Sequence, residues 1–466
     1  MKVFNTLTRE KEELKPIHPG EIRMYACGPT VYNYIHIGNA RPIIIFDVLR
    51  RYLEYRGMKV TFVQNFTDVD DKIIRKANEE GVASSEVSER FIREYQVDAK
   101  GLNVRPATVH PKVTENMDSI IEIVKTLVDR GYAYEVNGDV YFRTHKFKDY
   151  GKLSHMPLED LEAGARIAVD DIKEDPMDFA LWKAAKPGEP YWESPWGKGR
   201  PGWHIECSAM SRSILGETID IHCGGQDLIF PHHENEIAQS EAASGKTFAN
   251  YWMHNGYINV DNRKMSKSLN NFFTTREVAE KFGYEPIRFM MLQAQYRSPI
   301  NYSLEIIEQC KAALERLYTC KATLRRVKAA AKPGEFTEEQ KASLLKHRQD
   351  FIDAMDDDLN TADAIAAIFD LVKEINVNIS GTEQASLEYV TFAESLFLEL
   401  IDVLGLLYQD QEEQTIPEEV MKLVEERAAA RKAKDFAKAD QLRDEIAKMG
   451  YEVKETRQGT QITPIA

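Results

Sequence analysis

The first eighty residues alternate between strand-like and helix-like patterns, and this alternation limits the folds open to the chain. Residues 22–26 form a short apolar run, and residues 38–55 repeat apolar side chains every three or four positions up to Gly57. Residues 59–66 then have the pattern of a second strand, and residues 68–80 that of a second helix. Strands joined through single helices by short links usually pair in parallel. The sequence therefore predicts an α/β protein with a Rossmann-like, doubly wound parallel sheet.

Two further strand patterns, near Ile219 and near Trp252, indicate that the sheet resumes later in the chain. Between the two halves, residues 84–130 have a helical pattern, and Asn137-Gly138 is typical of a two-residue hairpin turn. Residues 147–200 are polar and irregular, which indicates an insertion that interrupts the sheet. We expect an α/β domain formed by residues 1–115 and 200–270, with a connective insertion at residues 116–199.

Beyond Tyr302 the apolar residues repeat at helical spacing in three long segments, which predicts an all-α bundle. An acidic linker follows, and residues 427–446 have the pattern of one helix. The predicted boundaries are a short region at residues 271–302, the helical bundle at 303–410 and a small C-terminal domain at 411–466.

Composition narrows the class of protein. A chain of 466 residues is too long for one hydrophobic core, and its net charge of −15 argues against indiscriminate nucleic-acid binding without excluding a local basic face. Its five cysteines are scattered, which is typical of a reducing cytoplasm rather than of a disulfide framework. The polar N-terminus does not have the pattern of a signal peptide, and the apolar runs are too short to span a membrane. We expect a cytoplasmic protein with no membrane partner.

Three metal-ligand types fall within one short stretch, at Cys207, His232 and Glu236. His232 and Glu236 are four positions apart, so a helix there would place both on one face. Thiolate, imidazole and carboxylate are ligands that Zn²⁺ accepts in a tetrahedral arrangement. A fourth ligand must come from elsewhere, and Cys27 is the best candidate because it lies beside another motif. Taken singly, these residues have simpler interpretations, because a lone cysteine is typical of an inert core position and a histidine beside another histidine is typical of a helix surface.

Two motifs accompany these ligands. In YIHIGNAR, His36 and Asn39 fall where a helix begins, and free N–H groups there favour an anion. Gly38 would let a flat ring approach the backbone. In KMSKS, Lys264 and Lys267 lie in a polar loop suited to closing on a pyrophosphate. Alone, the motifs are as typical of a capped helix and of a lysine-rich surface loop, but their pairing favours nucleotide chemistry.

These stretches resemble the class I aminoacyl-tRNA synthetases, and among them the cysteine-specific family. The resemblance extends from end to end through CGPTVYNYIHIGN, FTDVDDKII, PGWHIECSAM, GGQDLIFPHHENE and KMSKS, in the family's order. It implies ATP-dependent activation of L-cysteine to cysteinyl-adenylate, with Mg²⁺ accompanying ATP, and transfer to tRNA(Cys) by a monomer. It also implies one zinc ion per chain, which selects cysteine through its thiolate.

The resemblance assigns roles to particular residues. The metal ligands would be Cys27, Cys207, His232 and Glu236, and the cysteine pocket would include Thr67, Trp203 and Asp227. ATP would meet His36, Gly38, Asn39, Gly224, Gly225, Asp227, Lys264 and Lys267, of which His36, Asn39, Lys264 and Lys267 would act in catalysis. A basic helix face, at Arg427, Arg431, Lys432, Lys434 and Lys438, would meet tRNA, although by charge alone it is as typical of a solvated face.

Three other activities remain open at this point. A cysteine ligase acting on a non-tRNA amine, such as a sugar amine, would keep the zinc and adenylate motifs but lack the bundle and the basic helix. A non-catalytic module that binds zinc and nucleic acid would have no use for HIGN and KMSKS together. Synthesis of cysteine persulfides is attributed in the family to lysines near DDKII, where this chain has Lys72 and Arg75.

Overall fold

The computed structural model describes residues 1–156, 172–264, 271–379, 386–409, 418–433, 435–456 and 459–464. They fall into two compact units, considered separately below: residues 1–375 with 384–408, and residues 376–383 with 409–466. Among the helices of these residues, none has both the length and the apolar character needed to cross a bilayer.

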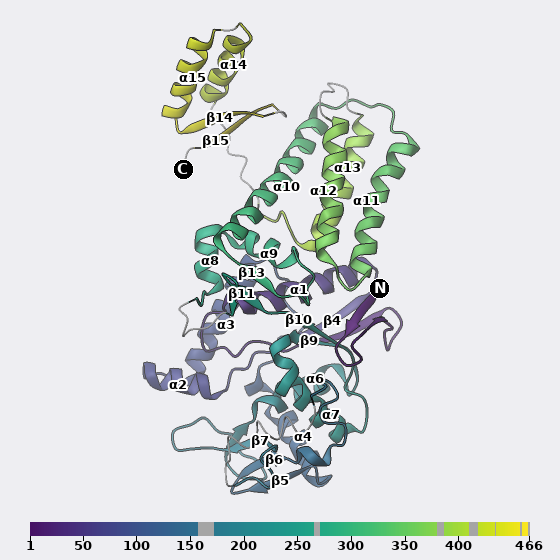
Figure 1. Cartoon of the computed structure of the whole chain (residues 1–466). Coiled ribbons are helices and arrows are strands. Elements are labelled where there is room, and N and C mark those ends of the chain that lie inside the picture. Colours follow the sequence, from purple (N-terminus) through teal and green to yellow (C-terminus); the bar gives the residue numbers. More distant parts are fainter. Residues whose placement is uncertain are drawn as a thin grey trace. The chain divides into compact units, whose positions relative to one another are not determined.

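A four-stranded parallel sheet forms the centre of the first unit, as the sequence predicts (Figure 1). Its order is β10-β9-β3-β4, and every neighbouring pair is parallel. The strands are β3 (Glu21–Ala26), β4 (Lys59–Gln64), β9 (Ile219–Gly225) and β10 (Ala249–Asn255). Strands near Ile219 and Trp252 are thus confirmed.

The direction of winding reverses between the two central strands. From β3 the chain passes through α1 (Ile37–Tyr55) to β4 on one side, and from β9 it passes through α7 (Glu234–Ser244) to β10 on the other. Ligands of open α/β sheets bind outside the carboxyl ends of the strands at such a reversal. Cys27 directly follows β3, and Gly225 ends β9, so both lie at this point.

The first two helices have the predicted ends. Helix α1 buries a continuous apolar set that includes Ile44 and Leu49 against the sheet, and Gly57 follows it with φ +85°. The N-terminus of α2 (Asp71–Glu80) is capped by Asp70, whose Oδ1 accepts a hydrogen bond of 2.8 Å from the backbone N–H of Lys72. Local capping therefore sets the start of α2.

The insertion is more regular than its composition indicates. It contains an antiparallel sheet of order β5-β6-β7-β8. The hairpin is confirmed, because Asn137 and Gly138 have φ of 53° and 87°, as a tight hairpin turn requires. The prediction of an irregular segment at residues 147–200 is wrong where β7 and β8 form. The strands are β5 (Ala133–Val136), β6 (Asp139–Phe142), β7 (Phe179–Ala184) and β8 (Gly199–Pro201).

A second correction concerns residues 84–130, which are not one helical segment. Helix α3 (Ser84–Gly101) and helix α4 (Met117–Asp129) are separated by a stretch containing Pro106 and Pro111, which cannot donate helical hydrogen bonds. The stretch instead runs beside β4, where Val63 and Val109 form a parallel bridge. In this stretch, backbone pairing with strand β4 therefore takes the place of helical hydrogen bonding.

Shorter elements surround the sheet. The N-terminus forms a hairpin of β1 (Lys2–Asn5) and β2 (Glu10–Glu13), and a three-stranded sheet has the order β12-β11-β13. The remaining elements of this region are α6 (Trp203–Leu215), β11 (Ile258–Val260), β12 (Arg263–Lys264), α8 (Thr275–Phe282), α9 (Tyr284–Leu292) and β13 (Ile300–Tyr302).

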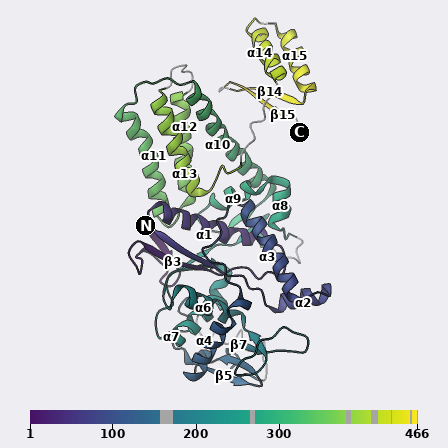
Figure 2. The same cartoon turned by 180° about the vertical axis from the view of Figure 1, so that it is seen from behind.

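The predicted all-α bundle is confirmed, and its helices run side by side (Figure 2). It comprises α10 (Leu304–Ala330), α11 (Glu338–Asp356), α12 (Thr361–Ile379) and α13 (Leu387–Leu404).

In the second unit the single helix predicted at residues 427–446 is wrong. Two helices, α14 (Glu418–Lys432) and α15 (Phe436–Lys448), are followed by the hairpin of β14 (Tyr451–Thr456) and β15 (Gly459–Pro464). Helix α15 begins anew because Asp435 caps it, with Oδ1 accepting from the Lys438 N–H at 3.1 Å.

Candidate functional site

The four predicted metal ligands lie together at the reversal point of the sheet. Their ligand atoms all lie within 4.8 Å of one another. Cys27 Sγ lies 3.6 Å from Cys207 Sγ, 3.5 Å from His232 Nε2 and 3.2 Å from Glu236 Oε1. His232 Nε2 and Glu236 Oε1 are 3.0 Å apart. Cys27 is half-buried, whereas the other three are buried.

These separations fit a tetrahedral metal centre. Bonds of about 2.0–2.3 Å to nitrogen, oxygen and sulfur place neighbouring ligand atoms about 3.3–3.8 Å apart. The four edges given above, of 3.0–3.6 Å, are close to this range. Two sulfurs, one imidazole nitrogen and one carboxylate oxygen form a donor set that suits a borderline-soft divalent ion. The cluster is therefore compatible with a metal site.

The local structure around His232 differs from the prediction. A single helix was expected from Pro231 onward, but α7 begins at Glu234, and His232 lies in the preceding segment η4 (Ile229–His233), which is kinked at Phe230 (φ −135°, ψ 133°). His232 and Glu236 nevertheless meet, so the spacing of four positions retains its predicted effect.

Opposite charges within the cluster shift its pKa values. Burial alone would raise the pKa of Glu236, but the imidazoles of His222 and His232 outweigh it and hold that pKa well below its usual range. Burial would lower the pKa of His232, whereas the Glu236 carboxylate raises it to about 10. A hydrogen bond from the Cys27 thiol lowers the pKa of Cys207 to about 6. Burial, followed by the hydrogen bond to Cys207, raises the pKa of the Cys27 thiol well above its usual range. Without a metal the cluster therefore favours a carboxylate at Glu236 and a thiolate at Cys207, and metal binding would have to displace protons from Cys27 and His232.

Sequence reasoning missed three buried histidines behind the ligands. His222 Nε2 lies 2.8 Å from Glu236 Oε2, and His233 Nδ1 lies 2.8 Å from His254 Nε2. The Nδ1 of His254 in turn lies 2.8 Å from the hydroxyl of Thr6. Cys27, His222, His233 and Glu236 form a second group whose ligand atoms also lie within 4.8 Å of one another.

A sequence signal for two of these histidines existed. His222 lies at the centre of the buried strand β9 and His254 near the carboxyl end of the adjacent strand β10, opposite Gly224. Polar groups inside a buried strand require hydrogen-bond partners, so a histidine there indicates a nearby polar site.

The HIGN segment is joined by its backbone to the chain that follows KMSKS. Ile37 N–H donates to Phe273 O at 3.0 Å, and Thr275 N–H donates to Ile35 O at 2.9 Å. The backbone N–H of His36 donates to Asn39 Oδ1 at 3.2 Å, which leaves the amide Nδ2 as a donor, as the prediction of a phosphate contact requires.

The lysines of KMSKS are only partly described. Lys264 ends β12, where its backbone pairs with Asn259, and its side chain lies outside the described residues. Lys267 lies outside them altogether. Both therefore remain sequence predictions.

Arg41, five residues after His36, links α1 to the segments at Gly256 and Ser298 by hydrogen bonds. It was not predicted from the sequence. Its side chain is fully buried and donates to the carbonyl oxygens of Gly256 at 2.8 Å, Tyr257 at 2.9 Å and Ser298 at 2.6 Å. Burial lowers the pKa of Arg41 to about 10, so the guanidinium keeps its charge at neutral pH. It fixes α1 against the segment that leads into β11.

The predicted ATP residues at the end of β9 are closely packed. A Cβ atom on Gly224 would lie 2.9 Å from His233 Cε1, and one on Gly225 would meet the Asp227 carboxylate. The two glycines thus allow a backbone approach that a side chain would block. Gly38 lies in the first turn of α1.

Two predicted cysteine-pocket residues border the cluster in different ways. The indole of Trp203, which is 40% exposed, stacks on His232 with ring centroids 4.3 Å apart. Thr67 is buried, and its hydroxyl donates to Glu206 Oε2 at 3.1 Å. Burial raises the pKa of Glu206 well above its usual range.

The residues of the predicted basic face in the second unit differ in their exposure to solvent. Arg427 is buried, at 7% exposure, whereas Arg431 and Lys438 are exposed. The Lys432 side chain and the whole of Lys434 lie outside the described residues.

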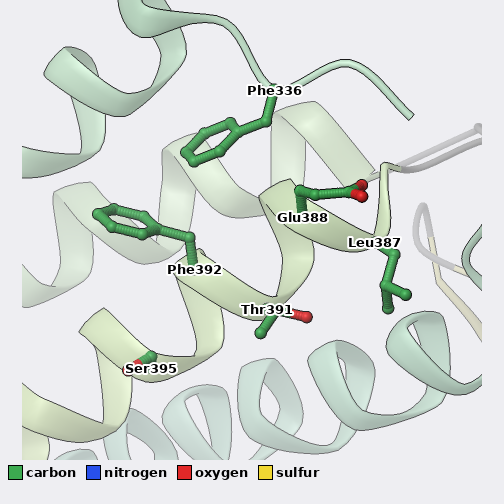
Figure 3. A pocket seen from close by; sticks show the side chains of 6 residues that line it. All are labelled: Phe336, Leu387, Glu388, Thr391, Phe392 and Ser395. Atoms are coloured by element: carbon green, nitrogen blue, oxygen red, sulfur yellow. The ribbon is translucent and has the colours of Figure 1, made fainter. Parts of the chain in front are cut away.

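Two cavities lie apart from the metal cluster. One of about 500 Å³ is a surface groove along α13, where Phe336 and Phe392 lie side by side (Figure 3). Another, of about 400 Å³, is lined by Asp68, Lys112 and Trp192, among others. Neither of these two cavities is lined by a predicted catalytic or ligand residue.

Family models match most of the chain. The model of the tRNA synthetases class I (C) catalytic domain matches residues 13–312, and that of the DALR domain matches residues 350–409. The model of the cysteinyl-tRNA ligase anticodon binding domain matches residues 413–462.

Full-length relatives agree with these models. A cysteine–tRNA ligase of Caldicellulosiruptor saccharolyticus is 56% identical over 467 residues, covering 100% of both chains. A cysteine–tRNA ligase of Clostridioides difficile is 58% identical over 463 residues, covering 98% of this chain and 99% of its own.

Solved structures show the same fold at low identity. Mycobacterium tuberculosis methionyl-tRNA synthetase in complex with methionyl-adenylate has a TM-score of 0.63 at 16% identity, covering 82% of this chain and 91% of its own. A putative arginyl-tRNA synthetase from Campylobacter jejuni has a TM-score of 0.57 at 12% identity, covering 84% and 94%. Since the catalytic model covers more than half of the sequence and both relatives match it along nearly their whole length, the chain belongs to the cysteine-specific class I tRNA synthetase family.

Proposed function

We propose that the chain is a cysteine–tRNA ligase, which activates L-cysteine with ATP and transfers it to tRNA(Cys). The observation that carries this proposal is the convergence of Cys27, Cys207, His232 and Glu236, whose ligand atoms all lie within 4.8 Å of one another. The substrate carboxylate attacks the α-phosphorus of ATP, forming cysteinyl-adenylate and releasing pyrophosphate. The terminal ribose of tRNA then attacks the activated carbonyl and releases AMP. Both nucleophiles are substrates, so the protein supplies positioning and charge stabilisation.

The residues at the two signature motifs would act on the phosphates. His36 and Asn39 would hold them at the start of α1, where backbone N–H groups favour an anion. Lys264 and Lys267 of the KMSKS motif would stabilise the charge that develops on the pyrophosphate. Mg²⁺ would accompany ATP. Gly38, Gly224, Gly225 and Asp227 would line the nucleotide site.

The four-ligand cluster would hold one Zn²⁺ per chain. When bound, this ion supplies a centre that takes the substrate thiol as thiolate, which serine and alanine do not offer. An ordinary pocket separates such small side chains by only about 1–3 kcal/mol, a difference that often requires an editing domain. Trp203 and Asp227, together with Thr67, would hold the rest of the amino acid. Selection by sulfur would therefore make editing unnecessary.

The other parts of the chain would meet tRNA. We propose that residues 1–115 and 200–270 form the catalytic domain, that residues 116–199 connect its halves, and that residues 271–302 contact the tRNA stem. The bundle at 303–410 and the domain at 411–466 would bind the rest of tRNA, with Arg431, Lys432, Lys434 and Lys438 on the anticodon side, whereas Arg427 is buried and would not contact tRNA. We further propose that the enzyme works as a cytoplasmic monomer.

The decisive experiment is amino-acid-dependent pyrophosphate exchange, run with and without a zinc chelator and followed by charging of tRNA. L-cysteine alone should support exchange, and the chelator should abolish it. A ligase acting on a non-tRNA amine would also exchange pyrophosphate with cysteine but would leave tRNA uncharged. The match of residues 413–462 to an anticodon binding domain speaks against that alternative.

A further inference from the structure

A chain of three buried polar side chains connects the four-ligand cluster with Thr67, which the proposed function places in the cysteine pocket. Asn65, Thr67 and Glu206 are 0%, 2% and 1% exposed. Asn65 follows β4, and Glu206 lies in α6 directly before the ligand Cys207. Neither Asn65 nor Glu206 has a role in the proposed reaction. Because buried polar groups must be paired, the direction of each hydrogen bond in the chain can be deduced.

The backbone fixes the orientation of the Asn65 amide. Gly28 N–H, which can only donate, lies 2.9 Å from the Asn65 Oδ1 position, and the hydroxyl of Tyr25 lies 3.1 Å from it. This atom must therefore be the amide oxygen. The other amide atom, Nδ2, is then a donor, and it lies 3.3 Å from Thr67 Oγ1.

The orientation of Asn65 in turn fixes the hydroxyl of Thr67. That oxygen already accepts from Asn65 Nδ2, so its single proton is free to be donated, and Glu206 Oε2 lies 3.1 Å away. A carboxyl oxygen accepts this hydrogen bond whether or not the other oxygen of the group carries a proton. A hydroxyl has one proton and two lone pairs, so one lone pair of Thr67 remains. The capacity left for a ligand is that of an acceptor.

We propose that Glu206 and Asn65 are positioning residues that hold the Thr67 hydroxyl as a hydrogen-bond acceptor for the α-ammonium group of the amino acid. The inference rests on the proposed function, in which Thr67 lines the cysteine pocket. It assigns recognition of the ammonium to a different group from recognition of the thiol. The two are linked through Asn65, because Cys207 Sγ lies 3.7 Å from its Oδ1, while its Nδ2 donates to Thr67.

The test compares two thiol ligands on the metal-loaded, full-length protein. L-cysteine carries the ammonium group, and 3-mercaptopropionate is the same molecule without it. In Glu206→Leu the Thr67 proton loses its acceptor and can turn toward the ligand. The dissociation constant for L-cysteine should rise about 10- to 100-fold, the scale of one hydrogen bond to a charged group. Binding of 3-mercaptopropionate should change by less than about threefold.

Matched variants separate positioning from folding. Glu206→Gln keeps a carbonyl acceptor for Thr67 and should bind both ligands as the wild type does. Thr67→Val removes the acceptor itself and should reproduce the loss that is specific to L-cysteine, whereas Thr67→Ser should restore binding. Circular dichroism and metal content should be unchanged in each of these variants.

The outcomes are distinct. Equal weakening of both ligands in Glu206→Leu, or unchanged binding of L-cysteine in both Glu206→Leu and Thr67→Val, would overturn the inference while leaving the proposed function intact. If Glu206→Gln is as impaired as Glu206→Leu, the acceptor role is also wrong. Failure of the wild type to exchange pyrophosphate with L-cysteine would instead overturn the proposed function, and the assignment of Thr67 with it.

Discussion

The Nε2 atom of His222 lies 2.8 Å from Oε2 of Glu236, and both side chains are fully buried. This contact occupies one carboxylate oxygen, while the other oxygen, Oε1, lies beside Cys27 and His232. His222 thus orients the carboxylate of a proposed metal ligand without belonging to the proposed four-ligand cluster.

We predict that His222→Ala weakens zinc binding by about 10- to 100-fold, the usual effect of removing a group that holds a metal ligand. His222→Gln offers a side-chain N–H at a similar reach and should lose less. Competition with a chromogenic chelator measures both affinities. Equal affinity of His222→Ala and the wild type would show that Glu236 needs no such support.

Removing a predicted ligand should have a larger effect. Purified wild-type protein should contain about one zinc per chain, as one four-ligand site implies, and Cys207→Ala should lose both zinc and cysteine affinity. Cys223→Ala is the matched control, because Cys223 is equally buried but donates to the backbone oxygen of Tyr25 at 3.4 Å. The ligand assignment is wrong if Cys207→Ala keeps full zinc and full cysteine affinity.

Lys267 is expected to act on the transition state of adenylation. Lys267→Ala should slow adenylate formation by roughly 10²–10³-fold, the scale of a lost charge-stabilising donor, with a smaller effect on ATP affinity. Lys246→Ala, which alters an exposed lysine paired with Glu217, should change neither. Single-turnover measurements separate the two constants. Weaker ATP binding at an unchanged rate would indicate uniform binding instead.

The second unit should matter for tRNA alone. Removing residues 411–466 deletes α14, α15 and the final hairpin but none of the catalytic motifs. The truncated enzyme should keep cysteine-dependent pyrophosphate exchange and lose kcat/KM with whole tRNA. A local basic face can attract tRNA although the net charge of the chain is −15. Salt screens the interaction of exposed charges beyond about 8–10 Å, so acidic residues farther away than this have little effect on the face.

Two controls sharpen the truncation experiment. The loss should shrink for a tRNA that already lacks its anticodon arm, and the salt dependence of tRNA binding should flatten as fewer counterions are released. Equal damage to pyrophosphate exchange and to charging would mean that residues 411–466 support the fold.

Acid should destabilise the protein through His110. Its Nε2 accepts from Ala107 N–H at 3.0 Å, and its Nδ1 lies 2.9 Å from Gln64 O. Burial lowers its pKa in the folded protein. Below about pH 6.5 the unfolded chain therefore binds a proton that the folded chain does not, and stability falls by up to about 1.4 kcal/mol per pH unit until the folded pKa is passed.

His110→Gln should remove this contribution to the pH dependence. The difference in the free energy of unfolding between about pH 7.5 and pH 5 should be smaller in the variant than in the wild type. Chemical unfolding at both pH values measures it. Identical pH dependence in the two proteins would show that His110 does not titrate between folded and unfolded states.

Periodicity predicted the elements whose burial pattern is local. Helix α1, the hairpin at Asn137-Gly138 and the bundle follow from spacing and turn residues. The stretch around Pro106 could not be predicted, because its conformation comes from pairing with β4, which is distant in the chain. The break at Asp435 was overlooked, although an aspartate before an apolar run is a recognisable capping signal.

The residues of the candidate site also fall into those that the sequence could indicate and those that only the structure could show. Cys27, Cys207, His232 and Glu236 could be proposed from ligand chemistry and from resemblance. The buried groups around them, such as His254 and Glu206, have partners set only by tertiary contact. A single sequence carries no direct record of such pairs.

The position of β9 between β3 and β10 has a consequence for synthesis on the ribosome. Cys27 emerges early, but Cys207, His232 and Glu236 emerge only after the whole insertion has been made. Until β9 follows, the edge of β3 that will pair with it is open, and open strand edges favour wrong partners. A nascent chain is therefore expected to need protection for the time that translation of the insertion takes, and to load metal only in the second half of its synthesis.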